Sequence, residues 1–462
     1  MKEICFETKF NCPAQELFDW HARPGAFERL TPYWEPVTIQ EQHGLIKNGD
    51  WVKLSLALGP ISLGWHLIHS EYKKGEKFCD MQAPGLFKGP FNYWRHEHIV
   101  QKIDDDNSIL LDRISYRNPL SFIGDIFGDH FVKAKLKRLF KYRHSITEND
   151  IKANKYLEKE NKIMKILIAG STGLVGTELT SFLRHQGHEV TSLTRSQKAS
   201  DQTLFWDPEA GILDETILDG FDAIINLAGE NIANKRWDAK QKEKIRSSRV
   251  NSTNLLSKAI ARLKNPPEVF ICASAIGYYG DRPLEALTED SLANKKDFLA
   301  ETCKEWEDAT KAASEAGVRV INTRFGIILS PKSGAMSKLL LPFQLGLGGI
   351  IGNGKQIMSW IALDDVVYAI NYLIQDSSIS GPVNFTTPEP VTNHEFTKTL
   401  GKVLNRPTIF PVPAFGAKLV FGEMADALLL SSAKVQPVKL IASRFKYAYP
   451  DLESALRHLL GK

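Results

Sequence analysis

The chain lacks most of the features that mark secreted and nucleic-acid-binding proteins. Its 462 residues include only five cysteines, none spaced as a pair: Cys5, Cys12, Cys79, Cys272 and Cys303. This pattern argues against a disulfide framework or a zinc site, and it favours a reducing compartment. The formal net charge of +4 is small for this length, so nothing in it suggests nucleic acid as a partner.

Long apolar runs are also missing. No stretch of about 18 uncharged apolar residues is present, so we expect no transmembrane helix. The most apolar late segment, 413–430, contains Lys418, Glu423 and Asp426, and we interpret it as a buried helix. The first ten residues, MKEICFETKF, carry charges where a signal peptide needs an apolar core. We therefore expect a cytoplasmic protein.

What remains has the composition of an ordinary globular chain, with 43% hydrophobic and 24% charged residues. Its length suggests about two to four domains. The clearest boundary is the polar, charge-rich segment 148–163, because the apolar run ILIAG follows it directly. A run of this kind is typical of a buried parallel strand. We predict a first domain over 1–147, a charged linker over 148–163 and a second domain that begins at Met164.

The first domain has the pattern of an antiparallel sheet with a closing helix. WVKLSLAL, LGWHLIHSEY, FNYWRHEHIVQKI and SILLDRISYR alternate apolar and polar residues. Two short helices are predicted before them, at 13–20 and 22–30. In the closing segment FVKAKLKRLFKYRH, one helical face carries Val132, Leu136, Leu139 and Phe140. A curved sheet wrapped on one long helix can enclose an apolar cavity.

Most of residues 1–147 resembles the helix-grip family of the START and polyketide-cyclase type, notably in CPAQELFDWHARPGAFERLTP and GPFNYWRHEHIV. The resemblance implies an apolar ligand held between sheet and helix. We interpret the histidines of this domain, including His66 and His69, as polar residues of the sheet. His96 and His98 share a strand face, but the sequence places no third ligand beside them, so we predict no metal site.

The second domain opens with the pattern of a dinucleotide-binding turn, KILIAGSTGLVGTELTSFL. Gly170 permits a tight turn, Gly173 lets the backbone approach a pyrophosphate, and Gly176 lets the next helix pack closely. The start of that helix favours negative charge. Because strand, turn and helix follow in the required order, we predict cofactor contacts from Gly170, Ser171, Thr172, Gly173, Leu174, Val175 and Gly176.

The next strand, HEVTSLTRS, indicates which cofactor binds. Its end lies about 20 residues after the glycines, where an NAD enzyme carries an acidic residue for the ribose 2′-hydroxyl. Here Thr194, Arg195 and Ser196 offer a cation and two hydroxyls, which suit a 2′-phosphate. The sequence therefore favours NADP(H).

Three further buried strands, in DAIINLAGE, VFICASAIGYYG and RVINTRFGIIL, alternate with helical stretches at 240–263 and 297–316. The turn formed by Asn226, Leu227, Ala228 and Gly229 would let the backbone pass close to the cofactor. The fold class is thus α/β, a doubly wound parallel Rossmann sheet over 164–385. A small C-terminal cap over 386–462 completes it, and an α+β helix-grip domain precedes it.

From Met164 to about Ser380 the chain resembles the extended short-chain dehydrogenases/reductases, on their nucleotide-sugar epimerase side. NLAGENIANKRW, FLAETCKEWE, IMSWIALDD and PVPAFGAKLVFGEMADALLLSS resemble one atypical subgroup, the epimerase family proteins with a small C-terminal domain of unknown role. The resemblance implies an NADP-dependent oxidoreductase or epimerase with a small-molecule substrate. Superfamily members often dimerise through helices that flank the sheet, so the resemblance also allows a homodimer.

The family's catalytic set is a serine or threonine at the end of the fifth strand, then Tyr-x-x-x-Lys on the next helix. Ala275 takes the expected serine position and Ser274 lies one residue earlier. Lys304 takes the lysine position, where it would also hold the nicotinamide ribose, but Ala300 stands in place of the tyrosine. Alanine cannot transfer a proton. The nearest substitutes in sequence are Tyr278, Tyr279 and Glu301.

We take Ser274, Tyr279 and Lys304 as the candidate catalytic residues. We expect Asp364 and Asp365 to cap a helix. Three functions stay open. The chain is an NADP-dependent oxidoreductase or epimerase, a non-catalytic NADP(H)-binding regulator, or a fusion whose first domain delivers an apolar ligand to a reductase.

Overall fold

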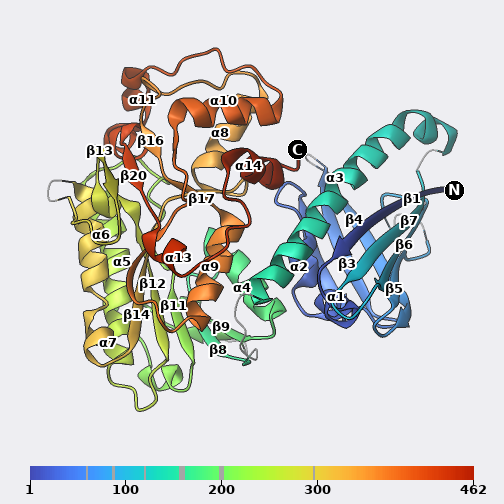
Figure 1. Ribbon diagram of the computed structural model, residues 1–462, viewed down its shortest axis with the longest axis horizontal. Coiled ribbons are helices and arrows are strands. Elements are labelled where there is room, and N and C mark those ends of the chain that lie inside the picture. The colour runs from blue at the N-terminus through green and yellow to red at the C-terminus, as the bar shows by residue number, and fades with distance from the viewer. Residues whose placement is uncertain (59–60, 86–88, 119–120, 156–161, 197–201, 295–296) are drawn as a thin grey trace. The chain divides into compact units, whose positions relative to one another are not determined.

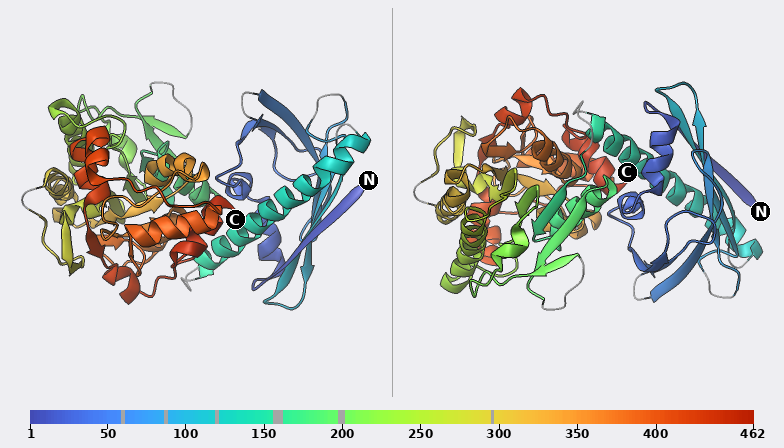
Figure 2. Two further views of the ribbon diagram at one scale, coloured as in Figure 1. Left: turned by 90° about the horizontal axis from the view of Figure 1, so that it is seen from above. Right: turned by 90° about the horizontal axis from the view of Figure 1, so that it is seen from below.

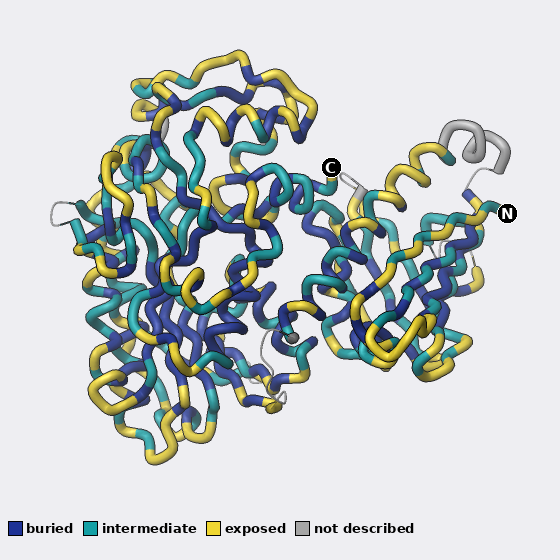
Figure 3. The backbone as a smooth tube through the Cα atoms, viewed as in Figure 1, coloured by how far each residue is buried: buried dark blue, intermediate teal, exposed yellow. Residues whose placement is uncertain are grey.

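The computed structural model of the chain describes residues 1–58, 61–85, 89–118, 121–155, 162–196, 202–294 and 297–462 (Figure 1). The chain divides broadly into two compact units on either side of residues 156–161, and buried residues form a core in each (Figure 3). Within the described ranges, no helix combines the length and the apolar character that crossing a membrane requires.

The first unit is a seven-stranded antiparallel sheet with a long helix along one face (Figure 2). The strands lie in the order β1-β7-β6-β5-β4-β3-β2. The elements are β1 (Lys2–Phe10), α1 (Ala14–Ala22), α2 (Ala26–Leu30), β2 (Val37–His43), β3 (Trp51–Leu58), β4 (Ile61–Lys73), β5 (Lys77–Gln82), β6 (Tyr93–Lys102), β7 (Ser108–Arg117) and α3 (Ser121–Lys155).

Helix α3 packs on the sheet through the face that the sequence predicts. Leu136 and Phe140 are buried in the core beside Trp94 and Ile114, and Val132 and Leu139 pack against the same cluster. The helix also continues beyond the predicted end of the domain, so residues 148–155 of the expected linker are helical. The reason is that this segment continues the buried face of the helix, which includes Asp150, Ile151 and Ala153. Most of the remaining linker, 156–161, lies outside the described residues.

The second unit contains a seven-stranded sheet whose strands all run parallel, as predicted. Its elements up to residue 385 are β8 (Lys165–Ala169), α4 (Leu174–His185), β9 (Glu189–Thr194), β10 (Thr203–Phe205), η1 (Glu215–Leu218), β11 (Ala223–Asn226), α5 (Ala239–Ile260), β12 (Val269–Ala275), η2 (Ile276–Tyr279), β13 (Arg282–Leu287), α6 (Phe298–Asp308), α7 (Lys311–Glu315), β14 (Arg319–Phe325), β15 (Ile327–Leu329), α8 (Gly334–Gln344), β16 (Ile357–Met358), β17 (Trp360–Ala362), α9 (Leu363–Gln375) and β18 (Gly381–Phe385).

The strand order is β10-β9-β8-β11-β12-β14-β18, which is doubly wound and confirms the predicted fold class. Helices α5, α6 and α7 lie on one face of the sheet, and α4 and α9 on the other (Figure 1). The order reverses between β8 and β11. In sheets of this kind ligands bind beyond the carboxyl ends of the strands, at such a reversal.

The C-terminal segment is mainly helical and belongs to the second unit. Its elements are β19 (Val391–Thr392), α10 (Asn393–Leu404), α11 (Ala414–Phe421), α12 (Glu423–Ala425), η3 (Asp426–Leu430), β20 (Ala433–Val435), α13 (Val438–Ala442) and α14 (Leu452–Leu460). The interpretation of 413–430 as one buried helix is wrong. Gly422, at φ +61°, ends α11, and Phe415 and Leu419 are each 76% exposed.

Candidate functional site

The ends of β8 and β11 meet backbone to backbone at the reversal in strand order. Gly170 has a φ of +82°, which disfavours residues with a side chain. A Cβ atom there would lie 2.7 Å from the carbonyl carbon of Leu227 and 2.8 Å from the nitrogen of Ala228. The turn after β8 can therefore approach β11 this closely only because residue 170 is glycine.

The other two glycines of the turn serve different purposes. A Cβ atom on Gly176 would collide with the carbonyl oxygen of Gly170, so this glycine lets α4 pack directly on the turn. Thr172 and Gly173 are exposed, and α4 begins immediately after them at Leu174. The N-terminal end of a 12-residue helix thus opens to solvent beside the strand reversal. Such a helix start attracts phosphate.

A cation stands at the end of the neighbouring strand β9. Arg195 forms an ion pair with Glu209 at 3.7 Å. Both side chains are exposed, that of Arg195 to 71% and that of Glu209 to 64%. Such an exposed pair contributes little stability, so it leaves the guanidinium available to an anionic ligand. Thr194 Oγ1 accepts a hydrogen bond from the Ser196 amide at 3.1 Å. This orders the backbone beside the arginine.

Asn226, whose side chain was given no role in the sequence analysis, fixes the turn after β11. Its Oδ1 accepts from the Ala228 amide at 3.1 Å, and its Nδ2 donates to Thr253 Oγ1 at 2.9 Å. The side chain is fully buried. Leu227 and Ala228 are half-buried and Gly229 is exposed. The backbone that is predicted to pass the cofactor is therefore held by a buried amide.

The hydroxyl of Ser274 is held in a buried ionic network. Ser274 Oγ donates to Glu307 Oε1 at 2.7 Å, and the residue is 1% exposed. Arg324 holds both oxygens of the same carboxylate, from Nε and from Nη2, each at 2.8 Å. A direct contact between Ser274 and a substrate would require the side chain to leave this network.

Tyr279 belongs to the same network and is also fully buried. Its hydroxyl accepts from Arg324 Nη1 at 2.8 Å and lies 2.7 Å from Asn384 Oδ1. Burial raises the pKa of Tyr279 to about 12. The Arg324 guanidinium also lies over the ring of Tyr278, 3.6 Å from its centroid. These tyrosines and Arg324 therefore form one packed group.

Lys304 lies outside this network. Its Nζ is 2.6 Å from Asp308 Oδ2 on the solvent face of α6, and the side chain is 60% exposed. The hydrogen bond that Lys304 donates to Asp308 raises the pKa of Lys304. Glu301 is exposed, whereas Ala300 is fully buried. The structure thus joins two of the three candidate catalytic residues, Ser274 and Tyr279, and leaves the third apart.

Asp364 and Asp365 lie in the first turn of α9, as expected, but the residue that caps this helix is Ala362 and no side chain caps it. Asp365 accepts from the amides of Ala448 and Tyr449, at 2.6 and 3.1 Å, and His458 Nε2 lies 3.1 Å from Asp364 Oδ2. Burial raises the pKa of Asp365 to about 7. Both carboxyls instead fasten the C-terminal segment to the start of α9.

The first unit encloses a cavity of about 540 Å³. Apolar side chains from the sheet and from α3 line much of it, including Leu54, Leu67, Trp94 and Leu136. Polar side chains also line it and are buried or half-buried: His21, His69, Asp80, His96, His98 and Arg143. The cavity therefore combines apolar walls with buried or half-buried polar side chains.

Comparison with known proteins agrees with this geometry. The family model described as NAD dependent epimerase/dehydratase family matches residues 166–384, and a domain of unknown function, DUF1731, matches 412–459. Epimerase family protein Mb2239 of Mycobacterium bovis is 40% identical over 291 residues, which cover 63% of this chain and 96% of that protein.

Two solved structures are also similar. Human epimerase family protein SDR39U1 with NADPH is 34% identical with a TM-score of 0.59, and the match covers 64% of this chain and 99% of that chain. The nucleoside-diphosphate sugar epimerase from Corynebacterium glutamicum is 32% identical with a TM-score of 0.81, and covers 99% of this chain and 90% of that chain. The sequence match to Mb2239 and the cofactor-type turn at Gly170 place the chain in the NAD dependent epimerase/dehydratase family, alongside the relatives called epimerase family proteins.

Proposed function

We propose that the second unit binds NADP(H) and acts as an oxidoreductase or epimerase on a small polar or carbonyl substrate. The observation that carries this proposal is the close approach of Gly170 to Leu227 and Ala228 at the reversal of strand order. That place is where a doubly wound sheet binds a dinucleotide. The NADPH in the structure of the human relative supports the choice of cofactor.

Each part of the cofactor has matching residues. The turn Gly170–Gly176 and the start of α4 fit the pyrophosphate, because Thr172 and Gly173 are exposed and the turn carries no bulky side chain at its closest approach. Arg195 fits the 2′-phosphate, with Thr194 and Ser196 beside it, and Leu227–Gly229 would pass along the nucleotide. When bound, the cofactor supplies a hydride donor or acceptor, while the protein supplies position and electrostatics.

Ser274, Tyr279 and Lys304 remain our candidates for the catalytic set. Their contacts give them different tasks. Lys304 is exposed and could turn from Asp308 toward a ribose, whereas Ser274 and Tyr279 are buried and would act through Arg324 and Glu307. Ser274 and Tyr279 are therefore candidates for positioning other groups rather than for donating a proton.

The second candidate function is a non-catalytic NADP(H)-binding regulator. The observation that favours it is the burial of Ser274 and Tyr279, together with alanine at position 300. Turnover decides between the two functions. NADPH oxidation by the wild-type chain with any member of a panel of carbonyl substrates supports the enzyme, and its absence in protein that binds NADPH supports the regulator.

Cofactor choice is tested by fluorescence titration with NADPH and NADH. We expect tighter binding of NADPH, and Arg195→Ala should weaken NADPH by about 10- to 100-fold, since a hydrogen bond to a charged group contributes about 1.5–3 kcal/mol. NADH affinity should barely change. Arg262→Ala, which removes another exposed arginine of this unit, is the control. Equal wild-type affinities for the two cofactors would end the proposal of NADP(H) preference.

For the first unit we propose a ligand-holding function of the helix-grip type. The cavity of about 540 Å³ and the order of strands and closing helix support it. An apolar fluorescent probe should bind the full chain and be displaced by lipids or polycyclic compounds. Leu56→Trp, which narrows the cavity, should reduce binding. Ser55→Trp, one residue away on the other face of β3, should not.

Delivery of such a ligand to the second unit for reduction is the remaining alternative. It requires that a compound that displaces the probe is also consumed together with NADPH. If no displacing compound is consumed, the two units bind their ligands for separate purposes.

A further inference from the structure

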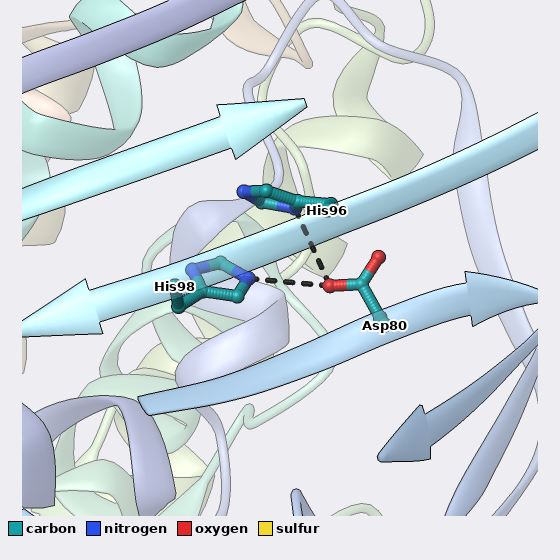
Figure 4. A group of neighbouring side chains, drawn as sticks. All are labelled: Asp80, His96 and His98. Atoms are coloured by element: carbon teal, nitrogen blue, oxygen red, sulfur yellow. Dashed lines mark hydrogen bonds and ion pairs between the residues drawn. The ribbon is translucent and has the colours of Figure 1, made fainter. Parts of the chain in front are cut away.

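Three neighbouring strands of the first unit bring two histidines and two aspartates together at the polar side of its cavity. In the sheet register, Asp80 of β5 faces His96 of β6, and Asp112 of β7 faces His98 of β6. All four are buried, with exposures of 8%, 2%, 2% and 7% in that order. Asp80, His96 and His98 also line the cavity (Figure 4).

Three atoms of this group converge. His96 Nδ1 lies 3.3 Å from Asp80 Oδ1, and His98 Nε2 lies 3.2 Å from the same oxygen. Two atoms that bind one metal ion at about 2.0–2.1 Å with a tetrahedral angle lie about 3.3–3.4 Å apart. A charge-assisted hydrogen bond between a ring nitrogen and a carboxylate is shorter, at about 2.7–2.9 Å. The contacts with Asp80 match the spacing of metal ligands.

Asp112 differs from Asp80 in this respect. Its Oδ1 lies 2.8 Å from His96 Nε2 and 2.8 Å from His98 Nδ1, and its Oδ2 lies 2.7 Å from His144 Nε2. The hydrogen bond between His96 Nε2 and Asp112 places a proton on that nitrogen and leaves a lone pair on Nδ1, which faces Asp80. His98 Nδ1 is close to Asp112 but does not have hydrogen-bond geometry. A carboxylate behind metal-binding histidines commonly fixes their orientation in this way.

The two oxygens of the Asp80 carboxylate have different partners, and one of them faces the two histidines. Trp94 Nε1–H donates to Asp80 Oδ2 at 3.3 Å, so Oδ1 is the oxygen turned to the histidines. Thr8 Oγ1, 2.8 Å from His144 Nδ1, extends the chain of contacts behind Asp112. Asp80 is the third candidate ligand, which the sequence analysis could not place beside His96 and His98.

We propose that Asp80 Oδ1, His96 Nδ1 and His98 Nε2 bind a divalent first-row transition-metal ion, of the Zn²⁺ or Fe²⁺ class, on the wall of this cavity. Two imidazoles and one carboxylate suit these ions better than Mg²⁺ or Ca²⁺, which prefer oxygen ligands alone. Three protein ligands leave a coordination position open, and it faces the cavity, where water or an oxygen atom of a ligand completes the site. The proposal does not depend on the nature of the apolar ligand.

The rival explanation is an ion-pair network without metal. Burial disfavours a charged ring, yet Asp80 and Asp112 raise the pKa of His96 to about 9, so an imidazolium ion there would also pair these carboxylates. The two explanations predict different amounts of metal bound to each chain. The ion-pair network binds no metal, whereas the metal site binds one ion per chain.

The test uses the full chain, stripped with a chelator and titrated with Zn²⁺ and with Co²⁺. We expect one ion per chain by elemental analysis, a visible Co²⁺ absorption band, and a rise in the unfolding temperature of the first unit with Zn²⁺. His98→Gln should abolish the Co²⁺ band. Asp112→Asn should weaken Zn²⁺ binding by about 10- to 100-fold, as loss of an outer contact does.

His43→Ala is the control, because His43 lies on β2 of the same sheet, is 72% exposed and makes its ion-pair contact with Asp50 rather than with the proposed ligands. It should keep the Co²⁺ band and the stoichiometry. The wild-type titration makes the test independent of whether a variant folds. Folded wild-type chain that binds no Zn²⁺ or Co²⁺, or a band that persists unchanged in His98→Gln, overturns the proposal in favour of the ion-pair network.

Discussion

Substitution of Ser274 by alanine distinguishes a structural hydroxyl from a catalytic one. The hydroxyl donates to Glu307 at 2.7 Å in a site where Ser274 is 1% exposed. A hydrogen bond to a charged group stabilises a fold by about 1.5–3 kcal/mol. Glu307 keeps both contacts with Arg324, so its charge stays paired and the larger cost of a stranded buried charge does not arise. We expect Ser274→Ala to destabilise the second unit by about 1.5–3 kcal/mol.

Calorimetry of the full chain can measure this loss. The transition of the second unit is the one that NADPH raises, because a ligand stabilises the state that binds it. At about 2–4 °C for each kcal/mol, Ser274→Ala should lower that transition by roughly 3–12 °C. Ser314→Ala is the control, since its hydroxyl bonds to the Lys311 carbonyl on an exposed helix. Its effect should stay within about 0.5 kcal/mol.

The same variant tests the catalytic alternative. NADPH affinity should be unchanged, because Ser274 contacts Glu307 and not the turn at Gly170. If the unfolding temperature does not move while turnover falls by about a hundredfold or more, the hydroxyl acts on the transition state. The structural explanation would then be refuted, and Ser274 would return to the catalytic set.

Three further outcomes follow from particular contacts. Gly170→Ala should weaken NADPH binding and destabilise the second unit by at least about 1–2 kcal/mol, because alanine disfavours the φ of +82° and its Cβ would meet Leu227; titration and calorimetry test this. Burial raises the pKa of Asp365 to about 7, so the folded chain holds a proton that the unfolded chain has released above about pH 4. Stability should therefore fall as pH rises from about 4 to about 7, by up to about 4 kcal/mol, and unfolding measured across that range should show a flatter curve for Asp365→Asn. Asp150→Ala should cost the first unit about 3–5 kcal/mol in denaturant unfolding, because it strands the buried Arg29, and a change below about 1 kcal/mol would contradict the pairing.

The sequence predicted correctly those elements whose structure depends mainly on residues close together in the chain. The turn Gly170–Gly176 and the apolar face of α3 are encoded within fewer than a dozen consecutive residues, and both lie where the sequence places them. Likewise, β7 was predicted with its observed ends, Ser108 and Arg117, because one face of the strand is buried and its residues alternate.

The strand that carries Asp80 was missed for the opposite reason. In β5 the three consecutive residues Phe78, Cys79 and Asp80 are all buried, so the strand shows no alternation. Its partner across the register, His96, is 16 residues away in sequence, and only the pairing of β5 with β6 brings them together. A ligand group built from three strands cannot be recognised before that register is known.

The sequence predicted the positions of the catalytic candidates in the second unit but not the burial of their side chains. The sequence places Ser274 at the end of β12 correctly, but it cannot show that Glu307 and Arg324 surround the hydroxyl. Arg324 lies 50 residues after Ser274, on the adjacent strand β14, and pairs with it in register. An arginine in a strand sequence gave no sign that it would be the centre of the buried network.

The alanine at position 300 fits the close packing of α6. It is not an isolated replacement of the family's tyrosine. Ala300 and its neighbours Thr302 and Cys303 are buried, and a Cβ atom on Gly277 would lie 3.3 Å from Leu299 Cβ. Helix α6 therefore packs closely on the turn after β12, and a tyrosine at 300 would overpack that contact, at a cost of about 1–3 kcal/mol or more. Restoring the family's tyrosine by Ala300→Tyr should destabilise the unit before it creates a proton donor. The cofactor turn at Gly170 does not depend on this contact, so NADP(H) binding and the family's usual proton transfer can be separated in this chain. A proton donor for any reaction here must come from outside position 300.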